Sequence, residues 1–89
     1  MHDTKKLLIE KNGLRCMLCG REMPYALINW HHIRPKADCR KHHEKIDNSY
    51  ENGALLCLDC HAIVHGYEYG SDKYTYFTMI MRANKSPAD

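Results

Sequence analysis

Two pairs of cysteines with the same short spacing constrain the fold of this 89-residue chain more than any other feature. Two residues separate the members of each pair, Cys16 from Cys19 and Cys57 from Cys60. This spacing lets both thiolates of a pair bind one tetrahedral zinc ion at about 2.3 Å. The alternative is a set of unrelated thiols or a redox motif. We favour structural Zn²⁺, and Cys39 is then an unpaired loop thiol.

A zinc staple suits a chain of this length, because a small domain buries only a modest core. Zinc binding on the order of 10 kcal/mol would be coupled to folding. No apolar run approaches the roughly 20 residues that span a bilayer, and no apolar leader precedes the charges at Glu10 and Lys11. We therefore expect one soluble, cytoplasmic domain over residues 1–89, with no membrane partner.

The hydrophobic pattern and the turn residues predict a small α+β domain. The C-terminal pattern also suits a strand, although a helix is favoured there. The expected elements are an N-terminal helix that Asp3 or Thr4 caps and that runs through Lys11, a strand over Tyr25–Ile33, a long loop over 34–52, a short strand over Ala54–Leu56, a helix over His61–His65 and a C-terminal helix over Tyr74–Arg82.

Histidines are placed to form a second metal site. His61 and His65 are four residues apart, which on a helix puts both imidazoles on one face. The helix starts at a cysteine pair, so its register is fixed next to the second strand. The first strand ends in His31 and His32 and can pair with the second. Three histidine nitrogens can then meet at one ion and leave coordination positions open, as in catalytic sites.

These motifs together resemble those of the HNH endonucleases. The resemblance covers about residues 16–66, leaves 67–89 as a C-terminal extension, and is carried by His31-His32-Ile33-x-Pro35, by Asn52 five residues before Cys57, and by Cys57-x-x-Cys60-His61-x-x-x-His65. It implies a zinc-stapled ββα-metal, treble-clef-like core. It also implies that His32 is the general base, that His31, His61 and His65 hold the catalytic ion, and that Asn52 positions the loop or the base.

The function that the resemblance implies is metal-dependent hydrolysis of DNA, by nicking or by double-strand cleavage. Imidazole can accept a proton from water near neutral pH, and a divalent ion can stabilise the charge that develops. Three imidazoles suit Zn²⁺, Ni²⁺ or Co²⁺, Mg²⁺ is the most available ion, and Mn²⁺ is a further candidate. The chain could also be the cleavage part of a restriction or phage packaging complex. The alternative is a non-catalytic zinc module that binds nucleic acid or protein.

A basic segment follows the paired histidines. The chain carries a net charge of only +2, too little by itself to indicate a nucleic-acid partner. Basic side chains are nevertheless concentrated after the first strand, and the candidates for contact with DNA phosphates are Arg34, Lys36, Arg40 and Lys41. A solvated loop is the alternative for the segment, and a solvated or ion-paired side chain is the alternative for Arg34.

Overall fold

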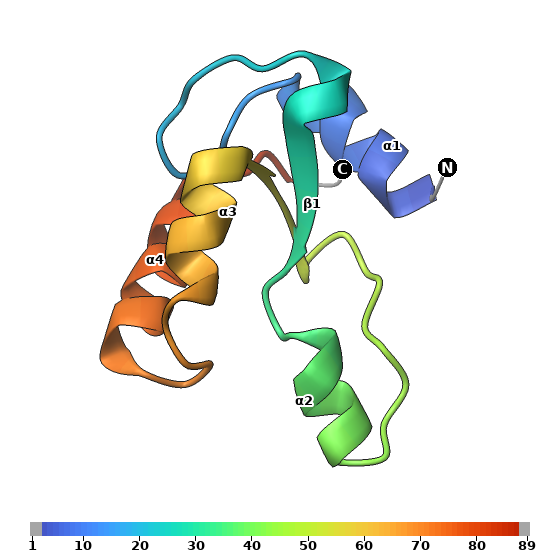
Figure 1. The fold of residues 1–89 in the computed structure, drawn as a ribbon. Helices are drawn as coiled ribbons and strands as arrows, with labels where there is room; N and C mark the ends of the chain where they lie inside the picture. The colour runs from blue at the N-terminus through green and yellow to red at the C-terminus, as the bar shows by residue number, and fades with distance from the viewer. Residues whose placement is uncertain (1–2, 88–89) are drawn as a thin grey trace.

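The computed structural model describes residues 3–87, which form a small α+β domain as the sequence predicts. Within that range a two-stranded sheet is surrounded by helices (Figure 1). In chain order the elements are α1 (Asp3–Asn12), the 3₁₀ helix η1 (Tyr25–Leu27), β1 (Ile28–His32), α2 (Lys36–Lys41), β2 (Gly53–Cys57), α3 (Leu58–His65) and α4 (Asp72–Ala83). None of the helices within residues 3–87 has the length and apolar content to cross a membrane.

The sheet places the two cysteine pairs and the paired histidines in one frame. β1 and β2 are antiparallel, with Ile28 opposite Cys57 and His32 opposite Gly53. Every residue of β2 is buried, so this strand runs through the core. α3 begins directly after β2, and Cys57 caps it by accepting a hydrogen bond from the amide of Cys60. The direction in which α3 leaves the sheet is therefore fixed at the cysteine pair.

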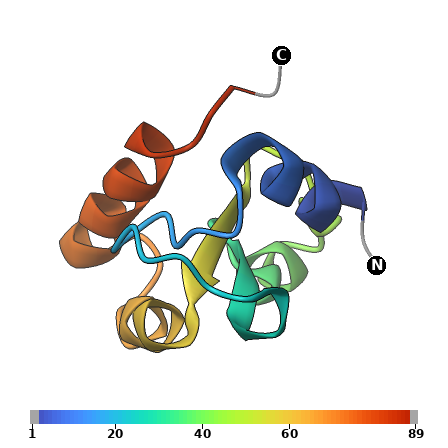
Figure 2. The ribbon, with the colours of Figure 1, turned by 90° about the horizontal axis from the view of Figure 1, so that it is seen from above.

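Helices cover the sheet from opposite sides. α1 packs against β2 through Leu8, which is fully buried, while α3 and α4 lie on the other side (Figure 2). α1 lies close to β2 at Gly53, where a Cβ would lie 2.8 Å from Cδ1 of the buried Leu8 and would force that side chain to shift. The amine of Lys85, just after α4, donates to the backbone oxygens of Tyr50, Glu51 and Gly53. This contact joins the end of α4 to the start of β2.

The prediction of a long loop over 34–52 was wrong in part, because α2 occupies Lys36–Lys41. A helix of six residues is too short to show a periodic apolar face, and only Cys39 in it is buried. An ion pair between Arg34 and Asp38 connects this helix to the segment after β1. The first strand is also shorter than predicted: residues 25–27 form η1 after Pro24, and β1 starts at Ile28.

Candidate active site

The four cysteines predicted to bind one ion do converge. The sulfur atoms of Cys16, Cys19, Cys57 and Cys60 all lie within 4.8 Å of one another. In each pair the backbone amide of the second cysteine donates a hydrogen bond to the sulfur of the first, with N···S distances of 3.4 Å from Cys19 to Cys16 and 3.5 Å from Cys60 to Cys57. Residues 3–87 contain no disulfide, and all five of their cysteines are free thiols. The cluster can therefore hold a metal ion with four thiolates.

Electrostatics inside the cluster show why an ion suits it. Burial opposes ionisation of Cys57, but hydrogen bonds from the Cys60 amide and thiol lower its pKa to about 7. Burial and the neighbouring sulfurs raise the pKa of Cys60. Four thiols in contact cannot all lose their protons unless positive charge compensates them, and a divalent cation supplies that charge.

Three histidines form a second cluster at the other end of β1 and α3. The candidate ligand nitrogens of His31, His61 and His65 lie within 4.8 Å of one another. The helical spacing of four residues brings the rings of His61 and His65 together edge to face, with their Nε2 atoms 2.9 Å apart. The ring of His31 approaches both from β1, with its centroid 5.4 Å from that of His61 and 5.7 Å from that of His65.

The environment of His31 favours the neutral form of this imidazole. The residue is 2% exposed, and burial together with the nearby rings of His61, His65 and His32 lowers its pKa to about 3. Burial and the neighbouring His65 also lower the pKa of His61. A neutral imidazole has a lone pair to offer, so these rings are in the protonation state that metal ligation requires.

The three imidazoles fit a divalent ion. Nδ1 of His31 is buried and has no hydrogen-bond partner within residues 3–87, which is costly for a polar atom unless something binds it. Two imidazole nitrogens bound to one tetrahedral zinc at about 2.0–2.1 Å are about 3.3 Å apart. The separation of 2.9 Å between His61 and His65 is close to that value. Three ligands leave coordination positions open for water or substrate.

His32 lies outside this cluster. Its ring stacks on Trp30, two residues back on the same face of β1, at a centroid distance of 4.5 Å. Nε2 of His32 lies 2.8 Å from Oδ1 of Asn48. Because that oxygen can only accept, Nε2 carries the hydrogen and Nδ1 keeps a free lone pair. Asn48 was not among the residues predicted from the sequence, since nothing in the segment before β2 indicates which residue reaches β1.

The side chain of Asn52 forms hydrogen bonds with backbone atoms of two neighbouring segments. The residue is 7% exposed, its Oδ1 accepts from the amide of Arg34 at 2.8 Å, and its Nδ2 donates to the oxygens of Asp47 and Arg34. These bonds tie the chain that leaves β1 to the chain that enters β2. Asn52 thus holds the loop, while the contact to His32 comes from Asn48.

The sequence left open whether Arg34 contacts phosphate, is solvated or is ion-paired, and in the structure it forms ion pairs. Its Nε lies 2.8 Å from Asp38, and its two terminal nitrogens lie 3.0 and 3.1 Å from the carboxylate oxygens of Glu44. A bidentate pair of this kind has a fixed geometry. The guanidinium therefore joins Asp38 within α2 to Glu44 in the segment after the helix, and it is not free to contact a phosphate unless both carboxylates release it.

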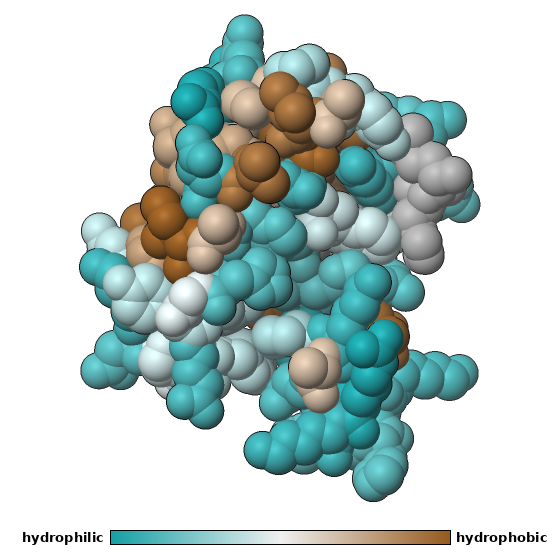
Figure 3. Space-filling view, viewed as in Figure 1, coloured by the Kyte–Doolittle hydropathy of each residue, from teal (hydrophilic) through white to brown (hydrophobic). Residues whose placement is uncertain are grey.

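The remaining predicted DNA contacts are available. Lys36, Arg40 and Lys41 are exposed, and within residues 3–87 their side chains form no ion pair. The surface over α2 is mostly hydrophilic, whereas hydrophobic side chains gather over α3 and the segments above it (Figure 3). α2 therefore presents free positive charge beside the histidines.

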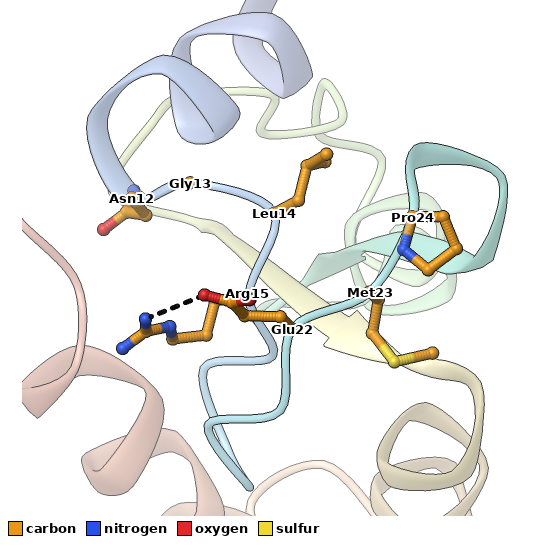
Figure 4. Close-up of a pocket in the computed structure, with 7 residues that line it drawn as sticks. All are labelled: Asn12, Gly13, Leu14, Arg15, Glu22, Met23 and Pro24. Carbon is orange, nitrogen blue, oxygen red and sulfur yellow. Dashed lines mark hydrogen bonds and ion pairs between the residues drawn. The ribbon is translucent and has the colours of Figure 1, made fainter.

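A hollow of about 420 Å³ joins these groups, lined by Trp30, His31, His32, Pro35, Lys36, Ala37, His61 and His65. The candidate ion ligands, the remaining strand histidine and one exposed lysine thus border the same space. A second hollow of about 450 Å³ lies between the end of α1 and the strand-like segment at Glu22 (Figure 4). Its polar groups include an exposed ion pair between Arg15 and Glu22, and it holds no cluster of titratable side chains. The chemistry is therefore concentrated in the first hollow.

A comparison with known families matches the part of the chain that contains both clusters. A family model described as HNH endonuclease matches residues 16–66, more than half of the chain. The match begins at the first cysteine and ends just after His65, so both clusters and the basic helix α2 fall within it, whereas α4 lies outside. The chain matches no curated protein.

Proposed function

The chain belongs to the HNH endonuclease family, and on this premise we propose that it is an endonuclease that hydrolyses phosphodiester bonds of DNA. One observation carries the proposal. Four histidines border a single hollow; three of them form the cluster that could hold an ion, and the fourth, His32, lies outside it. Water activation and charge stabilisation need different groups, because a nitrogen bound to a metal cannot accept a proton. The site offers both.

In this proposal His32 is the general base. Its Nε2–H is held by Asn48, so Nδ1 can take a proton from a water while the water oxygen bonds to phosphorus and the bond to the leaving oxygen breaks. Stacking on Trp30 keeps the ring in place. Asn52 positions the loop that contains Asn48, because its side chain bonds to the backbone at Asp47.

His31, His61 and His65 would hold the catalytic divalent ion. When bound, such an ion stabilises the negative charge that develops on the phosphate and on the leaving oxygen. Zn²⁺, Ni²⁺ and Co²⁺ suit three imidazoles, and Mg²⁺ and Mn²⁺ are the further candidates. The four-cysteine cluster would hold a structural Zn²⁺, because sulfur ligands that leave no position open are typical of structural sites.

DNA would approach over α2. Lys36 lines the hollow, and the exposed Arg40 and Lys41 extend the positive charge along the helix. Contacts of this kind bind backbone phosphates without regard to sequence and weaken as salt rises. Arg34 supports this surface from within through its ion pairs.

The test is a plasmid assay with isolated protein. Supercoiled DNA is incubated with Mg²⁺, Mn²⁺, Co²⁺, Ni²⁺ or Zn²⁺, and EDTA is expected to stop the nicking. His32→Ala should lower the rate by about 10²–10⁴-fold, the usual contribution of a general base, without loss of metal. The matched control is His42→Ala, which removes an exposed imidazole next to α2 and should leave the rate unchanged.

The possible outcomes separate the hypotheses. If His32→Ala nicks as fast as the unmodified chain, the assignment of the base is wrong. If the unmodified chain binds DNA but cleaves it with none of the ions, the chain is the non-catalytic zinc module that the sequence left as the alternative.

A further inference from the structure

The hydroxyl of Tyr74 connects α4 to the proposed metal site. Tyr74 is 4% exposed and lies in the first turn of α4. Its oxygen lies 2.6 Å from the backbone oxygen of Ile33 and 3.3 Å from Nε2 of His31. The residue is fixed from two sides, because Ser71 caps the helix at the amide of Tyr74 and the ring of Tyr69 packs edge-on at a centroid distance of 5.5 Å.

The positions of the hydrogens follow from these two contacts. A carbonyl oxygen can only accept, so the one hydrogen of the Tyr74 hydroxyl points to Ile33. The hydroxyl oxygen can then only accept from His31, which requires a hydrogen on Nε2. A neutral imidazole has one N–H, so the lone pair of His31 is on Nδ1. That atom is the buried one with no hydrogen-bond partner within residues 3–87.

We propose that Tyr74 is a positioning residue for the catalytic ion: it fixes the tautomer and the orientation of His31 so that the Nδ1 lone pair faces the space shared with His61 and His65. Histidine ligands commonly donate the N–H of the nitrogen that does not bind the metal to a carbonyl or a carboxylate, which sets ring orientation and basicity. Here the acceptor is a tyrosine oxygen, polarised by its own bond to Ile33. It adds no negative charge to the site.

Tyr74 belongs to α4, which lies outside the residues 16–66 that match the family model. The C-terminal segment would therefore contribute to the metal site and not only cover the core. The inference rests on the metal site of the proposed function, but it does not depend on DNA cleavage.

The experiment measures metal affinity and tautomer, both without DNA. Co²⁺ is titrated into protein that retains zinc at the cysteines, and its binding is followed by absorption and by competition with a chelator. Tyr74→Phe should weaken Co²⁺ binding by about 10–100-fold while the zinc content stays constant. Tyr76→Phe is the matched control, since it removes a hydroxyl from the same helix at an exposed position, and its Co²⁺ affinity should equal that of the unmodified chain.

The second measurement is made on the unmodified chain before Co²⁺ is added. Long-range ¹H–¹⁵N NMR spectra of the imidazoles should show His31 with its hydrogen on Nε2. A hydrogen on Nδ1, unchanged Co²⁺ affinity in Tyr74→Phe, or no binding of Co²⁺ to the unmodified chain would each overturn the proposal. If Tyr74→Phe fails to fold, the position of the His31 hydrogen in the unmodified chain still decides the proposal. Co²⁺ binding without DNA cleavage would contradict the proposed function alone.

Discussion

The two proposed metal sites should differ in what they contribute to folding, and substitutions at Cys57 and His61 test this difference. Cys57 is 0% exposed, lies at the junction of β2 and α3, and is one of four clustered sulfurs. A structural zinc site contributes on the order of 10 kcal/mol, comparable with the whole stability of a small domain, about 5–15 kcal/mol. Loss of one thiolate in Cys57→Ser should therefore cost at least about 3 kcal/mol.

His61→Ala should cost far less. His61 is only partly buried and lies within α3, where alanine is favoured over histidine by roughly 0.5 kcal/mol. The ring loses its edge contact with His31, which offsets that gain. The free energy of unfolding without catalytic ion should then stay within about 1 kcal/mol of the original value, whereas Co²⁺ binding and DNA cleavage should be lost.

The assay is urea unfolding followed by circular dichroism, with zinc content measured on the same samples. Cys39→Ser is the matched control, because it makes the same substitution at a thiol that is 0% exposed but lies in α2, outside the cysteine cluster. Its zinc content should be unchanged. Equal losses of stability in Cys57→Ser and His61→Ala, or full zinc content in Cys57→Ser, would refute the separation of a structural from a catalytic site.

Further predictions concern groups around the hollow. The pKa of His31 is lowered to about 3 in the folded chain, so as pH falls this histidine is protonated in the unfolded chain before it is protonated in the folded one. The free energy of unfolding without a bound ion should therefore fall as pH drops below about 6.5, by at most about 1.4 kcal/mol per pH unit. Urea unfolding of His31→Asn should show a shallower dependence on pH, and an equal dependence would show that another group causes the loss of stability. Lys36→Met should reduce the salt dependence of DNA binding by about one unit of slope. Arg34→Met should leave that slope unchanged and lower the free energy of unfolding, because two carboxylates lose their partner. Similar slopes for both variants would contradict the internal role of Arg34. Asn48→Ala should slow cleavage without weakening Co²⁺ binding, and a matching loss of metal would show that Asn48 acts on the ion site and not on the base.

The parts of the fold that could be predicted from the sequence depend on local signals. Gly13 ends α1 with a positive φ of 77°, a backbone conformation that glycine adopts easily. The spacing of four residues between His61 and His65 brings their nitrogens to one point on α3. The two-residue spacing of the cysteines likewise predicted a cluster that the structure contains. Each of these signals lies within one turn of chain.

The contacts that sequence reasoning missed are long-range. Asn48 lies 16 residues from His32, and Tyr74 lies 43 residues from His31. Both residues come from segments whose path depends on packing: Thr4 of α1 bonds to the backbone oxygen of Asn48, and α4 is placed by its buried face. A motif records which side chains do the chemistry, but it does not record which distant oxygen accepts a hydrogen bond from their ring N–H.

The adjacent histidines of β1 can now be explained by their partners. Neighbours on a strand point to opposite faces, so His31 meets α3 and α4 while His32 meets Trp30 and Asn48. β1 has no second strand beyond it within residues 3–87, so both rings can still border one hollow at its open edge. Nε2 of each ring lies within hydrogen-bond distance of an oxygen from a distant segment, so the proposed tautomer of both rings has its hydrogen on Nε2 and its lone pair on Nδ1. In the proposed function the two rings would then differ by their surroundings: Nδ1 of His31 is buried beside two other imidazoles and would bind the ion, whereas His32 lies apart from that cluster and would take a proton from water.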